Sequence, residues 1–167
     1  MTVSVRRLER DDDRTSFHSG NIELDRFFHL YAGQNQFRHH LGTSYVVVDD
    51  EQILGFVTVT PSELASSSEK KAARPRPVLR LARLAVDERW KGRGVGTLLL
   101  RVVFQLAHRL AREEGCVGVV GDAKPDAVTF YEKLGFEPVV ASAGHLGDRP
   151  EPTPLFLPLA LIPVDEE

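Results

Sequence analysis

The sequence predicts one domain with a mixed α/β sheet flanked by helices. Three observations predict this class. Runs rich in β-branched residues come early in the chain, a strand followed by a glycine-rich turn and a long amphipathic helix occupies its middle, and a further strand pattern returns near its end. A length of 167 residues suits one domain with a hydrophobic core, so we expect residues 1–167 to form a single domain.

The first part of the chain predicts a strand and then a helix. Residues 4–8 have the pattern of a short strand. The helical pattern that follows places apolar residues three and four positions apart, and we expect their shared face to pack in the core; they are Leu24, Phe27, Phe28, Tyr31 and Ala32. The polar segment 34–42 reads as a loop.

The next strands are predicted as a hairpin followed by a central strand. Residues 44–48 and 53–60 are rich in β-branched and aromatic residues, and the four polar residues between them signal a turn. Residues 62–77 contain serines, basic residues and prolines without periodicity, which predicts a basic, flexible loop. Residues 78–86 form the expected central strand.

The second half of the chain predicts further helices and strands. A long helix over 98–112 ends at Gly115, a strand follows over 116–120, and a short helix over 126–133. Gly135 opens another strand, and residues 155–161 are expected to supply the last. The pattern over 140–167 is the least clear of the chain.

The glycine-rich turn Lys91–Thr97 carries the main functional signal, because it precedes the long helix. Small residues leave backbone N–H groups uncovered, and the positive end of the helix dipole adds to them, which favours phosphate binding. The alternative is a merely flexible loop. The turn lacks the Gly-Lys-Ser/Thr ending of a P-loop and the later acidic residue of a Rossmann unit. Another anionic cofactor is therefore expected.

The charge distribution supports an anionic ligand. The chain has a net charge of −3, yet residues 70–112 hold twelve Lys and Arg against two acidic residues, a net +10. The glycine-rich turn lies inside this basic block. A solvated charged face is the alternative interpretation.

The sequence offers no sign of a membrane protein, a secreted protein or a metal site. We find no apolar run long enough to cross a bilayer and no secretory signal in the first residues, so we expect a soluble, cytoplasmic protein. Cys116, the single cysteine, reads as small core filler rather than as a reactive thiol. Adjacent His39 and His40 lack metal-ligand spacing, so no metal site is predicted.

Three motifs, in this order and spacing, resemble the GNAT acetyltransferases: Arg83–Asp87, Lys91–Gly96 and Phe130–Phe136. The resemblance implies a mostly antiparallel, twisted sheet with a splayed central strand pair, and an enzyme that uses acetyl-CoA and no metal. It implies that the glycine-rich turn holds the pyrophosphate and that the preceding strand lies along the pantetheine arm. Lys91 departs mildly from the family pattern, which has Gln or Arg there. The cofactor-binding residues implied are Leu84, Ala85, Val86, Lys91, Gly92, Arg93, Gly94, Val95, Gly96, Thr97, Phe130 and Lys133.

Tyr131 is the catalytic candidate. The resemblance implies that this tyrosine gives its proton to the leaving thiolate, which has a pKa near 8.5 and benefits from a hydroxyl donor. The alternative is a packing aromatic with a satisfied hydroxyl group.

The match extends to the GNAT toxins of type II toxin–antitoxin systems, through segments 17–27, 76–87 and 122–124. It implies that the acceptor is the α-amine of aminoacyl-tRNA and that an antitoxin protein is a partner. A homodimer of this chain is a further expected assembly. An α-amine with a pKa near 7.7 to 8.0 needs little help to lose its proton, and no general base is evident in the sequence. Small-molecule or protein amines, and a non-catalytic CoA-binding module, stay open as alternatives. The expected substrate or RNA contacts are Lys70, Lys71, Arg74, Arg76, Arg80 and Arg83.

Overall fold

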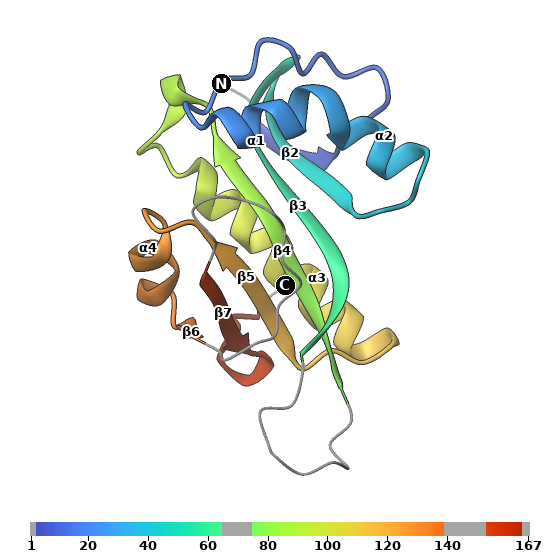
Figure 1. Cartoon of the computed structure of the whole chain (residues 1–167), viewed down its shortest axis with the longest axis vertical. Coiled ribbons are helices and arrows are strands. Elements are labelled where there is room, and N and C mark those ends of the chain that lie inside the picture. The colour runs from blue at the N-terminus through green and yellow to red at the C-terminus, as the bar shows by residue number, and fades with distance from the viewer. Residues whose placement is uncertain (1–2, 65–74, 139–152, 165–167) are drawn as a thin grey trace. The chain divides into compact units, whose positions relative to one another are not determined.

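The structure, a computed structural model, describes residues 3–64, 75–138 and 153–164. The described strands are β1 (Val3–Arg7), β2 (Thr43–Asp49), β3 (Gln52–Leu64), β4 (Arg76–Val86), β5 (Gly118–Ala123), β6 (Glu137–Pro138) and β7 (Thr153–Pro158). They follow the order β1-β2-β3-β4-β5-β7-β6 in one sheet (Figure 1). Four of the neighbouring pairs are antiparallel, β1 with β2, β2 with β3, β5 with β7 and β6 with β7, whereas β4 and β5 are parallel. The mixed, mostly antiparallel sheet predicted from the sequence is confirmed.

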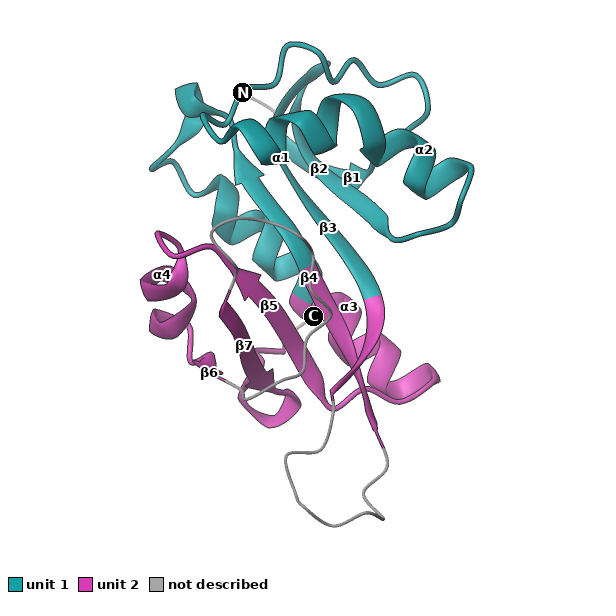
Figure 2. Cartoon of the chain, viewed as in Figure 1, with its two compact units in different colours: residues 1–60, 82–103 teal, residues 61–81, 104–167 magenta. Residues whose placement is uncertain are grey.

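The described helices are α1 (Ile22–Arg26), the π-helical turn η1 (Phe27–Tyr31), α2 (Ala32–Phe37), η2 (Glu88–Trp90), α3 (Val95–Glu113), α4 (Val128–Lys133) and η3 (Leu159–Leu161). The residues divide into two compact units, 1–60 with 82–103 and 61–81 with 104–167 (Figure 2). The boundary between the units falls within three elements, β3, β4 and α3, so each of them belongs partly to one unit and partly to the other. The glycine-rich turn belongs to the first unit, and Tyr131 belongs to the second.

An aromatic cluster forms the core of the first unit. The Phe56 ring on β3 stacks on Phe28, with centroids 4.3 Å apart, and Phe17 meets both rings edge-on at 5.0 and 5.6 Å. All three side chains are buried. Such contacts combine large apolar burial with favourable ring geometry. They hold the helical layer of α1, η1 and α2 against β2 and β3 (Figure 1).

Gly55 serves the opposite face of β3, because consecutive residues of a strand point to opposite faces. A Cβ at Gly55 would lie 2.7 Å from Val95 Cγ1 and 3.2 Å from Leu99 Cδ1, both on α3. Only a residue without a side chain lets the first turns of α3 pack this closely. Gly55 thereby sets where α3 begins relative to β3.

A register shift in the β2–β3 hairpin reaches the end of β4. Val47 pairs with Gly55 and Val48 pairs with Ile53, so Leu54 is an extra residue in β3. The carbonyl of Leu54 accepts a hydrogen bond of 2.9 Å from the backbone N–H of Asp87, just past β4. Bulges often redirect backbone groups beside functional sites. Here the bulge anchors the residue that starts the path to the glycine-rich turn.

The second unit has a smaller core and a short parallel pairing. Leu64, Val78 and Val120 form a buried cluster against Val117 and Phe156. The pairing of β4 with β5 runs from Leu79–Val119 to Leu81–Gly121, whereas β4 itself continues to Val86. Such a brief pairing agrees with the splayed strand pair that the GNAT resemblance implies. Parallel neighbours need a crossover connection, which α3 supplies.

Some boundaries predicted from the sequence are wrong. The segment 34–42 begins as helix α2, which continues to Phe37. The side chain of Gln36 donates to the carbonyl of Leu8 at 3.2 Å and accepts from the N–H of Ser44 at 2.8 Å, so a polar residue is satisfied by strand backbone rather than by solvent. The sequence pattern does not reveal this tertiary contact.

Strand ends also differ from the prediction. The two ends of the predicted loop 62–77 are strand residues, because β3 continues to Leu64 and β4 begins at Arg76. Residues 65–74 of this loop lie outside the described part of the chain. Strand β5 is shifted to Gly118–Ala123, and the N–H of Val117, just before it, donates to the carbonyl of Pro77 at 2.8 Å. The last strand ends at Pro158, where η3 begins.

Candidate functional site

The glycine-rich turn is open to solvent and precedes a helix of 19 residues. Gly92 and Gly94 have φ angles of 77° and 84°, in the left-handed region that other residues adopt only at a cost. A Cβ at either position would meet no atom within 4 Å. Glycine is therefore required by backbone conformation, and the space in front of the turn is free of other described residues. The first N–H groups of α3 lack partners within the helix, which creates an anion-binding end.

Asp87 organises the chain between β4 and this turn. Its side chain is almost fully buried, and it accepts hydrogen bonds from the backbone N–H groups of His18 at 3.2 Å and Arg89 at 3.0 Å. The guanidinium of Arg89 also donates to the carboxylate, from Nε to Oδ1 at 3.0 Å and from Nη2 to Oδ2 at 3.2 Å. Burial alone would raise the pKa of Asp87, but these hydrogen bonds and the charge of Arg89 together lower it. Asp87 is thus a stable carboxylate that caps η2.

Two cations stand in the turn itself. The Lys91 ammonium donates to the carbonyl of Ser19 at 2.8 Å. The Arg93 guanidinium lies 5.0 Å from the centroid of the Trp90 ring, within the range of a cation–π contact. Both residues are exposed. The turn therefore combines oriented N–H groups with positive side chains.

Burial alternates along the end of β4, as expected for a strand with one face in the core and the other toward a cofactor. Ala85 is buried in the aromatic core of the first unit, whereas Leu84 and Val86 are half-buried. Consecutive strand residues face opposite sides, so Leu84 and Val86 point away from that core. This agrees with the expected position of the two residues along the pantetheine arm, which itself stays a prediction.

Tyr131 is buried on α4. Its ring meets Phe130 and Phe136 edge-on, with centroids 5.5 and 5.3 Å away. A Cβ at Gly121 on β5 would lie 3.5 Å from Tyr131 Cε1, an ordinary van der Waals distance, so the ring packs over this position of the strand. Burial, and to a smaller extent the negative charge of Asp122, raise the pKa of Tyr131 well above its ordinary value. The phenol is therefore neutral at physiological pH and has a proton to donate.

Asp122, the neighbour of Gly121, is held by Arg80. The Arg80 Nη1 atom lies 2.6 and 2.7 Å from the two carboxylate oxygens, and the Asp122 side chain is 4% exposed. Arg80 Nε also donates to the Ser62 hydroxyl at 3.3 Å. Among the described acids, Asp122 is the one whose charge acts on Tyr131. Asp122 belongs to a segment that resembles the family, but the sequence does not reveal its ion pair with Arg80.

The basic residues expected to contact the acceptor are distributed unevenly. Lys70, Lys71 and Arg74 lie outside the described residues. Arg76 is exposed at the start of β4, whereas Arg80 is bound to Asp122. The Arg83 guanidinium lies 3.9 Å from the centroid of Phe27. The roles of Phe130 and Lys133, both exposed on α4, also stay predictions.

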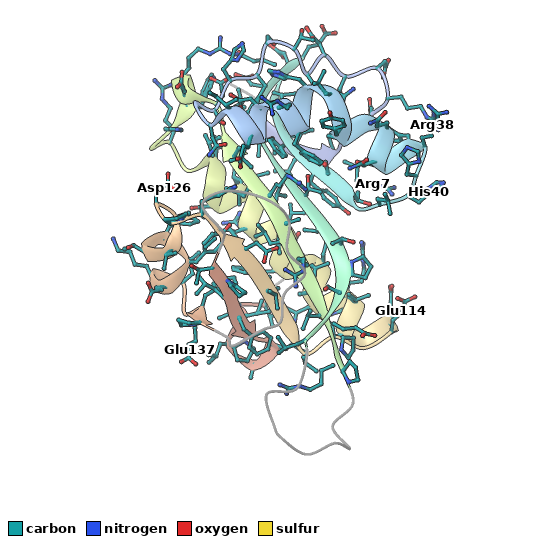
Figure 3. The ribbon with its side chains drawn as sticks, viewed as in Figure 1. Arg7, Arg38, His40, Glu114, Asp126 and Glu137 are labelled. Carbon is teal, nitrogen blue, oxygen red and sulfur yellow. The ribbon has the colours of Figure 1, made fainter. Side chains whose placement is uncertain are left out.

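Other candidate groups are dispersed in the described parts of the chain. No three His, Cys, Asp or Glu side chains there gather as metal ligands. Arg38 and His40 point outward from the end of α2 (Figure 3). Cys116 is buried and donates to the carbonyl of Gly118 at 3.2 Å. Within the same ranges, no helix combines the length and the apolar character that crossing a membrane requires.

The comparisons with known proteins agree with this fold. The profile of the acetyltransferase (GNAT) domain matches residues 40–138. The chain belongs to the GNAT family and is an acetyl-CoA-dependent N-acetyltransferase. It is 34% identical over 140 residues to a tRNA-acetylating toxin of Mycobacterium tuberculosis, covering 79% of this chain and 82% of that protein.

Two solved structures are also similar. One is a mutant of the toxin AtaT bound to the C-terminus of the antitoxin AtaR and to acetyl-CoA, with a TM-score of 0.80, 25% identity, and coverage of 97% of this chain and 96% of the other. The second is AtaT complexed with acetyl-methionyl-tRNAfMet, with a TM-score of 0.78, 25% identity, and coverage of 95% and 96%.

Proposed function

We propose that the protein transfers the acetyl group of acetyl-CoA to the α-amine of an aminoacyl-tRNA, and that Tyr131 is its general acid. The observation that carries the proposal is the buried, protonated phenol of Tyr131 on α4, within a chain that shares its family with a tRNA-acetylating toxin. The glycine-rich turn provides the seat for the CoA pyrophosphate.

The turn suits that ligand. Its two left-handed glycines expose the backbone, nothing described lies in front of their Cβ positions, and the positive end of α3 follows. Pyrophosphate is doubly anionic and matches oriented N–H groups near a helix N-terminus. Arg93 adds a positive charge at the rim. Leu84 and Val86 offer apolar surface to the pantetheine arm.

Tyr131 supplies the proton that the reaction needs. The acceptor nitrogen bonds to the thioester carbonyl carbon, and the carbon–sulfur bond then breaks. The phenol proton of Tyr131 passes to the departing thiolate, and the proton released by the acceptor nitrogen restores the neutral phenol through solvent. Because the phenol stays neutral at working pH, each turnover starts with the donor in place.

An α-amine is the acceptor that this site favours. Asp122, whose charge acts on Tyr131, is tied to Arg80, and we assign no carboxylate as a base. An α-amine with a pKa of about 7.7 to 8.0 is partly neutral at pH 7, whereas a lysine amine near 10.4 is almost fully protonated. The solved complex of AtaT with acetyl-methionyl-tRNAfMet supports the same acceptor class.

A direct assay tests the acceptor. The purified chain is incubated with acetyl-CoA and charged tRNA, uncharged tRNA, lysine-containing peptides or polyamines, and both free CoA thiol and N-acetylated product are measured. Charged tRNA is expected to give the highest kcat/KM, and uncharged tRNA none. Turnover with peptides or polyamines alone would replace this acceptor with a protein or small-molecule amine.

Matched variants test the acid. Tyr131→Phe is expected to lower kcat by about 10²-fold or more while CoA binding persists, and Tyr45→Phe on β2 is the control. If CoA binds and neither the wild type nor the variant turns over any amine, the chain is a non-catalytic CoA-binding module.

The proposal extends to physiology. Because tRNA and acetyl-CoA meet in the cytoplasm, we place the protein there, as a growth-inhibiting toxin with an antitoxin partner like that of AtaT. Induced expression should arrest growth, and Tyr131→Phe should relieve the arrest. Light scattering of the purified chain tests the predicted homodimer.

A further inference from the structure

The segment Phe17–Asp25, a family-like motif without a role so far, is fastened to the glycine-rich turn. The N–H of His18 donates to Asp87, and the carbonyl of His18 accepts from the N–H of Glu88 at 2.9 Å. One residue later, the carbonyl of Ser19 accepts from the Lys91 ammonium. Three hydrogen bonds therefore join two consecutive residues, 18 and 19, to the chain that leads from β4 into the turn.

Ser19 is itself rigidly held. It is 4% exposed, and both its N–H and its hydroxyl donate to the Asp25 carboxylate, at 2.9 and 2.7 Å. Its hydroxyl also accepts from the N–H of Asn21 at 3.2 Å, and Asn21 caps the N-terminus of α1. Lys91 is thus attached to a fixed point in the first unit rather than to a loose loop.

Gly20 shows that the two segments lie close together. Its φ angle is 91°, and a Cβ there would collide with the Glu88 carboxylate. Each residue of Ser-Gly-Asn has a separate role: the serine is bound by Asp25, the glycine adopts a left-handed conformation, and the asparagine caps α1.

We propose that Lys91 is a positioning residue for the acetyl-CoA site, which holds the glycine-rich turn in its binding geometry by tying it to Ser19. This inference rests on the proposed role of the turn as the pyrophosphate seat. Lys91 then acts through the backbone of the turn, and its ammonium does not need to touch a phosphate. Arg can make the same hydrogen bond to a carbonyl, which makes Lys91→Arg the conservative rescue.

A double-mutant cycle tests this coupling. CoA affinity is measured by the fluorescence of Trp90, the single tryptophan, which lies next to Lys91. Lys91→Met removes the tie from the turn, and Ser19→Ala loosens its anchor without altering any residue of the turn. Each is expected to weaken CoA binding about fivefold, the loss of one charge-assisted or buried hydrogen bond, and the double variant should be little weaker than either alone. Lys91→Arg should restore most of the affinity.

Ser44→Ala is the matched control, because Ser44 is also a buried serine of the first unit whose hydroxyl bonds a side chain, that of Thr58 at 2.7 Å. It should leave CoA affinity unchanged. Thermal unfolding by circular dichroism confirms that each variant is folded at the assay temperature.

Hydrogen exchange provides a readout that does not depend on activity. Saturating CoA should slow amide exchange in residues 18–25 of the wild type and of Lys91→Arg, but not of Lys91→Met. Additive losses, or a neutral Ser19→Ala, would overturn the inference and make Lys91 a direct phosphate ligand. Failure of the wild type to bind CoA would instead contradict the proposed function.

Discussion

Arg80 on β4 and Asp122 on β5 form a partly buried ion pair, and Asp122 directly follows Gly121, the glycine on which the Tyr131 ring packs. Consecutive strand residues face opposite sides, so the carboxylate and the ring lie on different faces of β5. Asp122 therefore acts on the phenol through its charge and not through contact. Arg80 holds that carboxylate in place through the ion pair, and leaving a largely buried charge without a partner would be costly.

Asp122→Asn should let Tyr131 ionise at lower pH, because the variant removes a negative charge that raises the pKa of the phenol. Ultraviolet titration of phenolate absorbance measures this, with Tyr131→Phe subtracted to remove the signals of Tyr31 and Tyr45. The descending alkaline limb of the rate profile should move to lower pH in parallel, because the acid works only while protonated. An unchanged titration would mean that burial alone raises the pKa of the Tyr131 phenol.

Stability should fall at alkaline pH, with Tyr131 as a cause. The pKa of Tyr131 is raised on folding above its ordinary value of 10.0, so its contribution is fully present below pH 10 and is lost as pH rises from there, where the unfolded chain ionises and the folded one does not. Urea unfolding between about pH 7 and 11 measures the slope. Tyr131→Phe should reduce that slope, and an equal slope in both proteins would assign the alkaline loss to other groups.

Tyr131→Phe should separate catalysis from binding. We expect kcat to fall by about 10²-fold or more, in the range of general acid catalysis, with CoA affinity within about twofold of the wild type. The ring packing against Phe130 and Phe136 does not require the hydroxyl group. Stopped assays of thiol release and Trp90 fluorescence provide the two measurements, and a parallel loss of CoA affinity would assign the hydroxyl a binding role.

Gly94→Ala should cost stability through backbone conformation alone. Its φ angle of 84° is strained for any residue with a Cβ, by about 1–2 kcal/mol, although the added atom has open space. Gly94→Val would in addition cover the N–H groups of the turn, and we expect it to weaken CoA binding by about tenfold or more. Calorimetric titration with CoA distinguishes the two variants, and equal affinities would argue against pyrophosphate at this turn.

Gly55→Ala should destabilise the first unit by a different mechanism. The new methyl group would overlap Val95 Cγ1 on α3, and such overpacking costs about 1–3 kcal/mol. Because α3 starts at Val95, the turn should shift as well, and CoA affinity should fall together with the melting temperature. The double variant Gly55→Ala with Val95→Ala, which makes room for the methyl group, should recover part of both.

The sequence predicted the elements best where periodicity and turn chemistry agree. The β2–β3 hairpin, α3 and the glycine-rich turn were found within a few residues, because β-branched runs, an apolar helical face and glycine signal them locally. The helical nature of residues 34–37 was missed, because Gln36 is stabilised by the backbone of Leu8 and Ser44, which are distant in sequence. Such partners leave no periodic signal.

The same division applies to the candidate site. Residue type and spacing singled out the glycine-rich turn and Tyr131 as candidate site residues, because glycine conformations and a phenol donor are properties of single residues in a short motif. Only the tertiary structure decided that Arg80 binds Asp122, that Lys91 binds Ser19 and that Arg83 covers Phe27. A cation's partner depends on which segments fold together, and charge in the sequence alone cannot distinguish a free cation from one already held by the protein.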